Sequence, residues 1–352
     1  MYFGPILFIS CLLACFVICF PTYKILQIYH IQDIPNHRSS HVVPTVRGGG
    51  IAILLTIGLV CTFVPLFCPF RVPLLAVLAL IILSVVSFID DVRGLSAQIR
   101  FGTHALAAIA LAWSSGLLDS NGLAASSGAK FGVPYPVIVG LMMLWMVGYT
   151  SAFNFMDGIN GIASFQAGLS ALAMVAVASA KMADWYTPSI LIALSVSGSA
   201  FGFIPHNFPR ARMFMGDVGS APLGLMLAFL VLWICNTQGF DLLIPLVIVN
   251  LNFVLDTGIT LVRRIARGDR WLEPHREHFY QRLVRSGWSH TAVTTWESVL
   301  LFSTAVVSVC VAKAGIPYQI WALVAAILLW LAFFIFADLR FKKYNVLGGA
   351  MQ

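Results

Sequence analysis

The stretch 80–91 reads Leu-Ile-Ile-Leu-Ser-Val-Val-Ser-Phe-Ile-Asp-Asp, an apolar run that ends in two adjacent carboxylates, Asp90 and Asp91. Together with the apolar residues before it, the run is suited to a helix crossing the ~30 Å of bilayer hydrocarbon. Two acids at a hydrocarbon boundary lose solvation and repel each other. The stretch therefore predicts a transmembrane helix whose charged end either pairs with Arg93 or Arg100, or meets a bound cation or a substrate proton.

The whole chain has this apolar character. Of its 352 residues, 59% are hydrophobic and 10% are charged, and the mean hydropathy is +0.90. Soluble domains carry about 25% charged residues. We therefore expect an all-α polytopic membrane protein that forms a single transmembrane domain over residues 1–352. It has about eleven expected spans, at 2–22, 49–67, 72–89, 102–118, 134–152, 162–180, 188–204, 219–235, 242–262, 297–312 and 317–337.

The basic residues predict the orientation of these spans. One set of loops and tails holds 17 lysines and arginines, and the other set holds the remaining 4 of the 21. The positive-inside rule places the richer set in the cytoplasm, with the N-terminus outside and the C-terminus inside. The net charge of +7 is explained by this asymmetry and by contact with anionic headgroups. Nucleic-acid binding is not expected, because no basic face with interleaved aromatic residues is found.

Polar clusters interrupt the chain at the ends of the spans, and the expected threading brings them all to the cytoplasmic face. Asp, Asn, His and Arg side chains gathered there are the groups that bind an anionic substrate carrying a hard cation. The clusters are Asp33–His41, Asp90-Asp91, Asn154–Gly161, Asn207–Ser220 and Pro274–His278.

Two of these clusters place oxygen ligands at the start of a span. Asn154, Asp157 and Asn160 form a glycine-containing turn, which is either a plain connection or a site for a nucleobase edge or cation. Asp217 opens the following cluster. It is either an acid favoured by the helix dipole or a ligand, and the flanking glycines favour the ligand because they allow close backbone approach.

The glycine-rich segment Arg47–Gly50 precedes the second span. It is not a P-loop, because the terminal Gly-Lys-Ser/Thr is missing. A phosphate at the start of the following helix is the alternative to a plain turn.

The ninth span and the loop after it carry further ionisable residues. Asp256 lies inside the span, and an ionisable residue there is functional or paired; we expect it to be the structural partner of a nearby arginine. The arginines of the loop 263–296 are expected to set orientation and contact headgroups. That role does not explain the tight spacing of His275, Arg276 and His278.

Taken in order, these motifs resemble the polyprenyl-phosphate N-acetylhexosamine-1-phosphate transferases of glycosyltransferase family 4. The Asn-x-x-Asp-Gly-x-Asp-Gly pattern is present except that Asn160 replaces the second acid, and the loop motif Pro-Asp-Arg-x-His-x-His has His275 and Tyr280 as replacements. These departures are similar to the branch that initiates O-antigen synthesis. The other matching residues are Asp33, Pro35, Arg38, His41, Pro44, Thr45, Gly48, Gly49, Asp90, Asp91, Asn154, Asp157, Gly158, Asn207, Gly216, Asp217, Gly219, Ser220, Pro274, Arg276 and His278.

The resemblance implies a reaction and a location. A sugar-1-phosphate, of N-acetylglucosamine or N-acetylfucosamine type, would pass from a UDP-sugar to undecaprenyl phosphate in the bacterial inner membrane, with Mg²⁺ neutralising the developing charge. A homodimer is left open. The implied roles are Mg²⁺ ligation by Asp217 and Asn154, lipid-phosphate positioning or proton removal by Asp90 and Asp91, uridine binding by Asp157 and Asn160, pyrophosphate contact by Arg264, Arg276 and His278, and substrate binding by His41.

Two rival functions remain at this stage. A lipid-linked sugar transporter would also be apolar and polytopic, but transporters carry their polar groups near the midplane in repeated halves, and no repeat is seen. A phospho-MurNAc-pentapeptide translocase would share the chemistry but take a far larger headgroup. A panel of UDP-sugars would separate the three.

Overall fold

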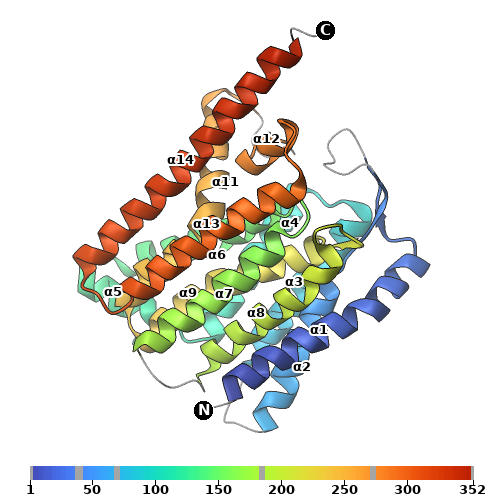
Figure 1. The fold of residues 1–352 in the computed structure, drawn as a ribbon. Helices are drawn as coiled ribbons and strands as arrows, with labels where there is room; N and C mark the ends of the chain where they lie inside the picture. The colour runs from blue at the N-terminus through green and yellow to red at the C-terminus, as the bar shows by residue number, and fades with distance from the viewer. Residues whose placement is uncertain (1–2, 36–42, 67–71, 182–186, 270–274, 350–352) are drawn as a thin grey trace.

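The computed structural model describes residues 3–35, 43–66, 72–181, 187–269 and 275–349, and these fold as one helical bundle (Figure 1). The helix α1 (Phe3–Ile28) packs along α8 (Pro188–Asn207), and α8 packs along α7 (Ile162–Lys181). Cys11, Cys15 and Cys19 of α1 are buried in this contact. The cysteines therefore serve as small packing residues.

The helix α9 (Asp217–Gln238) forms the core of the bundle, since 94% of the residues in its 18-residue apolar stretch are buried. It packs against α3 (Leu74–Arg93) and α6 (Tyr135–Met156). Asp217 opens α9, whereas Asp90 and Asn154 lie in the last turns of α3 and α6. This antiparallel packing brings three polar helix ends to the same end of the bundle.

The remaining helices surround this core. Asp338 and Arg340 lie on the part of α14 that continues past the expected end of the last span at residue 337, and α14 projects beyond the bundle in Figure 1. The bounds are α2 (Gly50–Phe63), η1 (Val64–Leu66), α4 (Ala97–Ser114), α5 (Leu123–Phe131), η2 (Phe240–Leu242), α10 (Leu243–Ile248), α11 (Leu251–Ala266), α12 (Phe279–Arg285), α13 (His290–Val311) and α14 (Ile316–Gly349).

The architecture confirms an all-α polytopic membrane protein. Within the described residues, eight helices are long and apolar enough to span a membrane, or nine when one bent pair counts as a span. Helices also lie at the other two expected spans, α2 at 49–67 and α4 at 102–118. However, α2 is short, and α4 is not among the helices that are long and apolar enough to span a membrane. The count of eleven therefore stays a prediction, as does the side of the membrane that each end faces.

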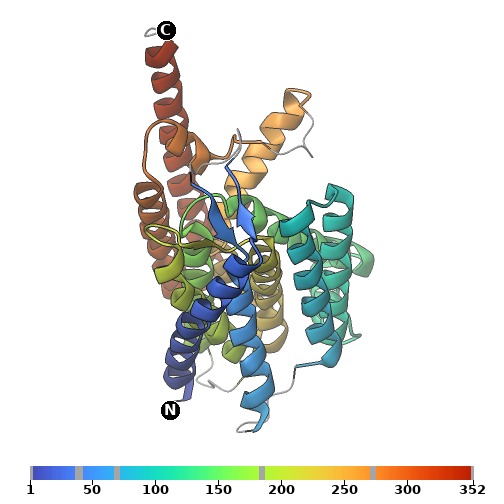
Figure 2. The ribbon, with the colours of Figure 1, turned by 90° about the vertical axis from the view of Figure 1, so that its right-hand side faces the viewer.

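The ninth span differs from the straight helix expected at 242–262, because α10 and α11 meet at a bend of 70°. Side chains satisfy the backbone groups that the break releases. The carbonyl of Val249 accepts hydrogen bonds from Ser170 Oγ (2.7 Å) and Gln166 Nε2 (3.3 Å), and Asn250 Oδ1 accepts one from Tyr149 Oη (2.7 Å). As a result, α11 leans away from the bundle axis (Figure 2).

A small sheet lies at the polar end of the bundle. Its strands β1 (Gln32–Asp33), β2 (Thr45–Arg47) and β3 (Met213–Phe214) are paired in that order, antiparallel and then parallel, with Arg47 opposite Phe214. Gly50 follows β2, and a Cβ there would lie 2.2 Å from the Cα of Gly219. The glycines after Arg47 are therefore required for the close approach of α2 to α9.

Candidate active site

The polar clusters meet at one end of the bundle, as the sequence predicts. Arg47, at the end of β2, forms ion pairs with Asp91 at the end of α3 (Nε–Oδ1, 2.6 Å) and with Asp217 at the start of α9 (Nη2–Oδ1, 2.9 Å). The two carboxylates outweigh the effect of burial on Arg47 and raise the pKa of its guanidinium. Arg47 thus joins two of the predicted clusters.

Asp91 is a structural anchor within this cluster. Its side chain is fully buried, and its oxygens accept hydrogen bonds from the backbone N–H groups of Asp217 (2.8 Å) and Val218 (2.9 Å). These are donors of the first turn of α9, which have no partner within the helix. Gly216, at φ +75°, is needed here because a Cβ would lie 2.7 Å from Asp91 Oδ2.

Asp90 faces a different environment from its neighbour. It accepts a hydrogen bond from the N–H of Leu95, and its Oδ2 lies 3.4 Å from Nη1 of Arg100. It lines a small cavity of about 10 Å³, together with Leu83, Val86, Ser87, Arg100, Thr103, His104, Asn154 and Asp217.

The donor set of this cavity fits a hard cation. Two carboxylates, Asp90 and Asp217, lie side by side, and Asn154, whose Nδ2 donates to Ser220 Oγ (3.2 Å), adds an amide oxygen. Within the described residues no three His, Cys, Asp or Glu side chains group as metal ligands. Carboxylate and amide oxygens are the ligand types that Mg²⁺ takes from a protein, with water and substrate phosphate completing its shell.

Asp157 lies in the turn after α6, and this turn contacts the loop 263–296 through Tyr280. Burial raises the pKa of Asp157 to about 7, and the nearby charge of Asp217 adds to the rise while Arg47 opposes it. The neighbouring Gly158 lies against Tyr280 of the loop, where a Cβ would come 2.0 Å from the phenol oxygen. Tyr280 Oη donates to the carbonyl of Phe155 (3.1 Å).

Asn160 is directed elsewhere in the structure. Its Nδ2 donates to the carbonyl of Pro209 (3.0 Å), and its Oδ1 lies 3.3 Å from Nδ1 of His290. Its carbonyl accepts a hydrogen bond from Thr294 Oγ1 (2.8 Å). These contacts tie the turn to α13 and to the loop after α8, so uridine binding by Asn160 stays a prediction.

His278 and Asp256 form a buried pair on the long loop and α11. The distance between His278 Nδ1 and Asp256 Oδ1 is 2.9 Å, and the side chains are 4% and 0% exposed. Asp256 also accepts from the backbone N–H of Phe279 (3.0 Å to Oδ2) and from Thr260 Oγ1 (3.3 Å). The expectation that Asp256 pairs with an arginine is wrong, because the start of α12 supplies its donors.

The two arginines that follow Asp256 find other acids. Arg263 pairs with Asp338 of α14 (2.7 Å), and Arg264 pairs with Glu277 (2.8 Å). The arginines around Glu277 outweigh the effect of its burial and lower the pKa of its carboxyl. Arg264, which is expected to contact the pyrophosphate, is therefore paired in the structure with the carboxylate of Glu277, the residue before His278.

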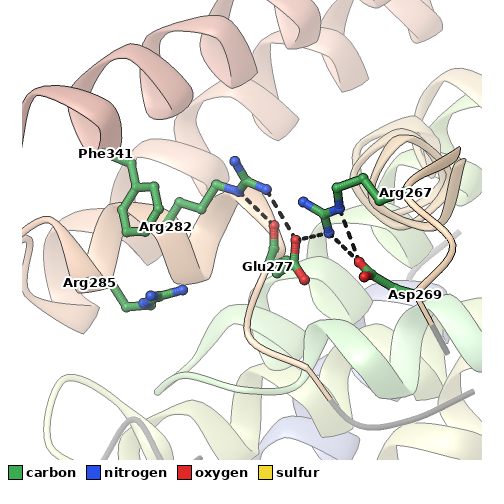
Figure 3. Close-up of a pocket in the computed structure, with 6 residues that line it drawn as sticks. All are labelled: Arg267, Asp269, Glu277, Arg282, Arg285 and Phe341. Carbon is green, nitrogen blue, oxygen red and sulfur yellow. Dashed lines mark hydrogen bonds and ion pairs between the residues drawn. The ribbon is translucent and has the colours of Figure 1, made fainter. Parts of the chain in front are cut away.

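An open pocket of about 470 Å³ lies beyond Glu277 (Figure 3). Arg267 bridges Glu277 and Asp269, and Arg282 lies 3.6 Å from Glu277 Oε2. The lining residues are Arg267, Asp269, Glu277, Arg282, Arg285 and Phe341. Arg276 contributes its carbonyl, which accepts from Arg285 Nη1 (3.0 Å).

Some predicted site residues cannot be placed, and others are added by the structure. His41, Arg38 and Pro274 lie outside the described residues. The sequence predicts only a structural pairing for Asp256, although an ionisable residue inside a span is a signal of function. The structure also adds side chains to which sequence reasoning gives no site role: Arg47, Arg100, His104 and Glu277.

Comparisons with known proteins identify the family of the chain. Residues 73–235 match the model of glycosyl transferase family 4. The chain is 31% identical over 310 residues to a decaprenyl-phosphate N-acetylglucosaminephosphotransferase of Mycobacterium leprae, covering 77% of this chain and 75% of that one.

Two further relatives have similar coverage. A probable undecaprenyl-phosphate N-acetylglucosaminyl 1-phosphate transferase of Bacillus subtilis is 30% identical over 268 residues, covering 73% and 71% of the two chains. A phospho-N-acetylmuramoyl-pentapeptide-transferase of Streptococcus pyogenes is 30% identical over 248 residues, covering 66% and 69%. The matched region contains the two aspartates that end α3, the turn after α6 and the start of α9, and this chain belongs to glycosyl transferase family 4.

Proposed function

We propose that the protein transfers an N-acetylhexosamine-1-phosphate from a UDP-sugar to undecaprenyl phosphate, which gives undecaprenyl-diphosphate-sugar and UMP. The observation that carries this proposal is the cavity lined by Asp90, Asn154 and Asp217 at the polar end of a bundle of membrane-spanning helices. The names of the Mycobacterium leprae and Bacillus subtilis relatives support the polyprenyl phosphate and the N-acetylglucosamine phosphate.

The chemistry requires little more than positioning and charge neutralisation. An oxygen of the lipid phosphate attacks the β-phosphorus of the UDP-sugar, a new phosphorus–oxygen bond forms, and the bond to the bridging oxygen breaks to release UMP. Asp217 and Asn154 would hold Mg²⁺, which supplies charge neutralisation at the pyrophosphate. Asp90 positions the lipid phosphate and accepts its proton, while Asp91 keeps the start of α9 and Arg47 in place.

The nucleotide sugar is assigned to the side of the cavity that faces the long loop. The uridine is bound by Asp157 and Asn160. The pyrophosphate is bound by Arg264, Arg276 and His278. Arg264 is paired with Glu277 at 2.8 Å. Binding therefore exchanges this carboxylate for the substrate pyrophosphate, whose two phosphates each carry one negative charge and offer several oxygens to the guanidinium fork. His41 completes the proposed substrate contacts.

The location and biological role extend the proposal. The positive-inside rule places the site at the cytoplasmic face of the bacterial inner membrane, where UDP-sugars are made. The product would begin the synthesis of an O-antigen or a related cell-envelope polysaccharide. The replacements Asn160, His275 and Tyr280 support this branch, and N-acetylglucosamine and N-acetylfucosamine are the sugars we expect.

The reaction can be tested with purified protein, undecaprenyl phosphate, Mg²⁺ and a panel of UDP-sugars, with UMP release as the readout. We expect turnover with UDP-N-acetylglucosamine or UDP-N-acetylfucosamine, and a fall in turnover on the order of 10²–10³ in Asp217→Asn. Exclusive use of UDP-MurNAc-pentapeptide would assign the chain to the activity of its Streptococcus pyogenes relative. Lipid-linked sugar movement without UMP release would favour a transporter instead.

A further inference from the structure

The two ring nitrogens of His278 lie in different chemical environments. Nδ1 lies 2.9 Å from Oδ1 of Asp256, in a contact where both side chains are buried. An ionised carboxylate can only accept hydrogen bonds, so Nδ1 carries a proton and donates it. Nε2 is then the nitrogen left for other chemistry, as an acceptor in the neutral ring and as a donor in the charged ring.

Asp256 is itself fixed in place. Both of its oxygens lie within 3.2 Å of the backbone N–H of Phe279, and Thr260 Oγ1 adds a donor at 3.3 Å. It lies on α11, one turn beyond the bend after α10. The carboxylate therefore ties the first residue of α12 and the His278 ring to the same point on a membrane helix.

Aromatic rings restrain the other directions of the His278 side chain. Tyr280 lies nearly parallel to it, with centroids 5.9 Å apart, and the His275 centroid is 4.8 Å away. The charged or titratable groups around the pair are His275, Glu277 and Tyr280 of the loop and α12, Arg264 of α11, Asp157 of the turn after α6, and Glu297 of α13. The ring has a fixed orientation, as expected for a group that must meet a substrate at one angle.

We propose that Asp256 is a positioning residue for the transfer reaction: it fixes His278 with a proton on Nδ1 and directs Nε2 to the phosphate oxygens of the substrate. The proposal rests on the proposed function, because it takes a pyrophosphate as the partner of Nε2. A carboxylate behind a functional histidine holds the ring tautomer and stabilises its charged form. In this proposal Asp256 holds the tautomer and the position of the ring through its contact with Nδ1.

The alternative is that Asp256 only caps α12 and holds the loop. A double-mutant cycle between Asp256→Asn and His278→Ala separates the two roles. We expect Asp256→Asn to lower kcat by about 10- to 100-fold with nearly unchanged KM values, and to have little further effect in the His278→Ala protein. The same loss in both backgrounds would show that Asp256 acts independently of His278, and would overturn the proposal.

Asp338→Asn is the matched control. Asp338 fastens the same region of the chain through Arg263 (2.7 Å) and Arg282 (2.9 Å), but it does not contact His278. Its effect should multiply with that of His278→Ala. If Asp256→Asn instead behaves like Asp338→Asn in the cycle, loop attachment is its whole role.

A second variant tests the pairing when the double mutant is too slow to measure. In His278→Asn, the side-chain amide can donate in place of Nδ1, but nothing replaces Nε2. His278 is also the N-cap of α12, where asparagine is favoured over alanine. We therefore expect the apparent melting temperature of His278→Asn to exceed that of His278→Ala by more when Asp256 is present than in Asp256→Asn, with turnover as low as that of His278→Ala; the same difference in both backgrounds would show N-capping alone. Wild-type turnover in His278→Asn, or equal melting temperatures for the two variants, would contradict the assignment of the nitrogens.

These outcomes are distinct from a failure of the proposed function. Wild-type protein that releases no UMP with any UDP-sugar would refute the reaction itself. The melting temperatures of the two His278 variants would still test the buried pair in that case.

Discussion

Asp90 and Asp91 are adjacent in sequence, yet we expect their amide variants to fail in different ways. Asp91→Asn should lower stability, whereas Asp90→Asn should lower turnover with little loss of stability. The reason is the surroundings of each carboxylate. Asp91 accepts from Arg47 at 2.6 Å and from two backbone N–H groups of α9. Asp90 has one backbone donor and lines the cavity beside Asp217.

The size of the stability loss follows from these contacts. Breaking a buried ion pair costs about 3–5 kcal/mol. Asparagine keeps one acceptor oxygen, and Arg47 keeps its pair with Asp217, so we expect about 2–4 kcal/mol for Asp91→Asn. With an unfolding entropy of about 2.1 cal/mol/K per residue, the 352 residues convert this loss to a fall of about 3–5 °C in apparent melting temperature.

Asp90→Asn should change the melting temperature by about 1 °C, since its side chain keeps an acceptor for Leu95 and is relieved of repulsion by Asp217. Its turnover should fall on the order of 10²–10³, the cost of losing one preorganised electrostatic group. Only this variant should move the acidic limb of the pH–rate profile. Both quantities can be measured on the same detergent-solubilised preparations.

A third variant, Asp91→Ala, is the control for the comparison of Asp90→Asn with Asp91→Asn. Asp91→Ala removes every acceptor and should fall further in melting temperature than Asp91→Asn. Equal melting temperatures for Asp90→Asn and Asp91→Asn would refute the anchoring role of Asp91. Wild-type kinetics in both would leave the two acids with a structural role only.

Three other predictions concern the metal, the nucleotide and the topology. Asp217→Asn should insert normally but lose on the order of 10²–10³ in turnover at limiting Mg²⁺, and near wild-type rates would exclude Asp217 from the metal site. The Asp157 carboxyl, with its pKa raised to about 7, is protonated below that pH, and the neutral acid is a weaker acceptor for the uracil N–H than the carboxylate, so the apparent KM for the UDP-sugar should rise as the pH falls and should lose this dependence in Asp157→Asn. Single cysteines at Gly122 and Lys181 should react with an impermeant reagent from the periplasm, and reaction at Arg276 from that side would overturn the orientation.

The convergence of the polar clusters could be predicted from the sequence because this prediction needs only the positions of the spans and of the polar residues at their ends. Apolar runs of span length define helices, and polar residues at their ends must meet water or one another. The contacts of Arg47 with Asp91 and Asp217, and of Tyr280 with the turn after α6, confirm this convergence. Ordered motifs on successive spans were sufficient to indicate which end of the bundle holds the site.

Tertiary contacts that have no local signal could not be predicted. The bend before α11 depends on Ser170, Gln166 and Tyr149 of other helices, which satisfy the backbone and side chain at Val249 and Asn250. A hydropathy profile contains no such information. The bend nevertheless decides where α11 points, and therefore which side chains Asp256 can meet.

The different surroundings of Asp90 and Asp91 follow from helix geometry once the neighbours are known. Successive residues of a helix point about 100° apart, so two adjacent acids at the end of α3 must face different neighbours. One direction meets the first turn of α9, whose unpaired N–H groups bind a carboxylate. The other meets the cavity with Asn154 and Asp217. Asp91 holds the first turn of α9 in place. It thereby makes Asp90 available for the proposed chemistry, because the carboxylate of Asp217 that Asp90 faces across the cavity is carried by the same turn.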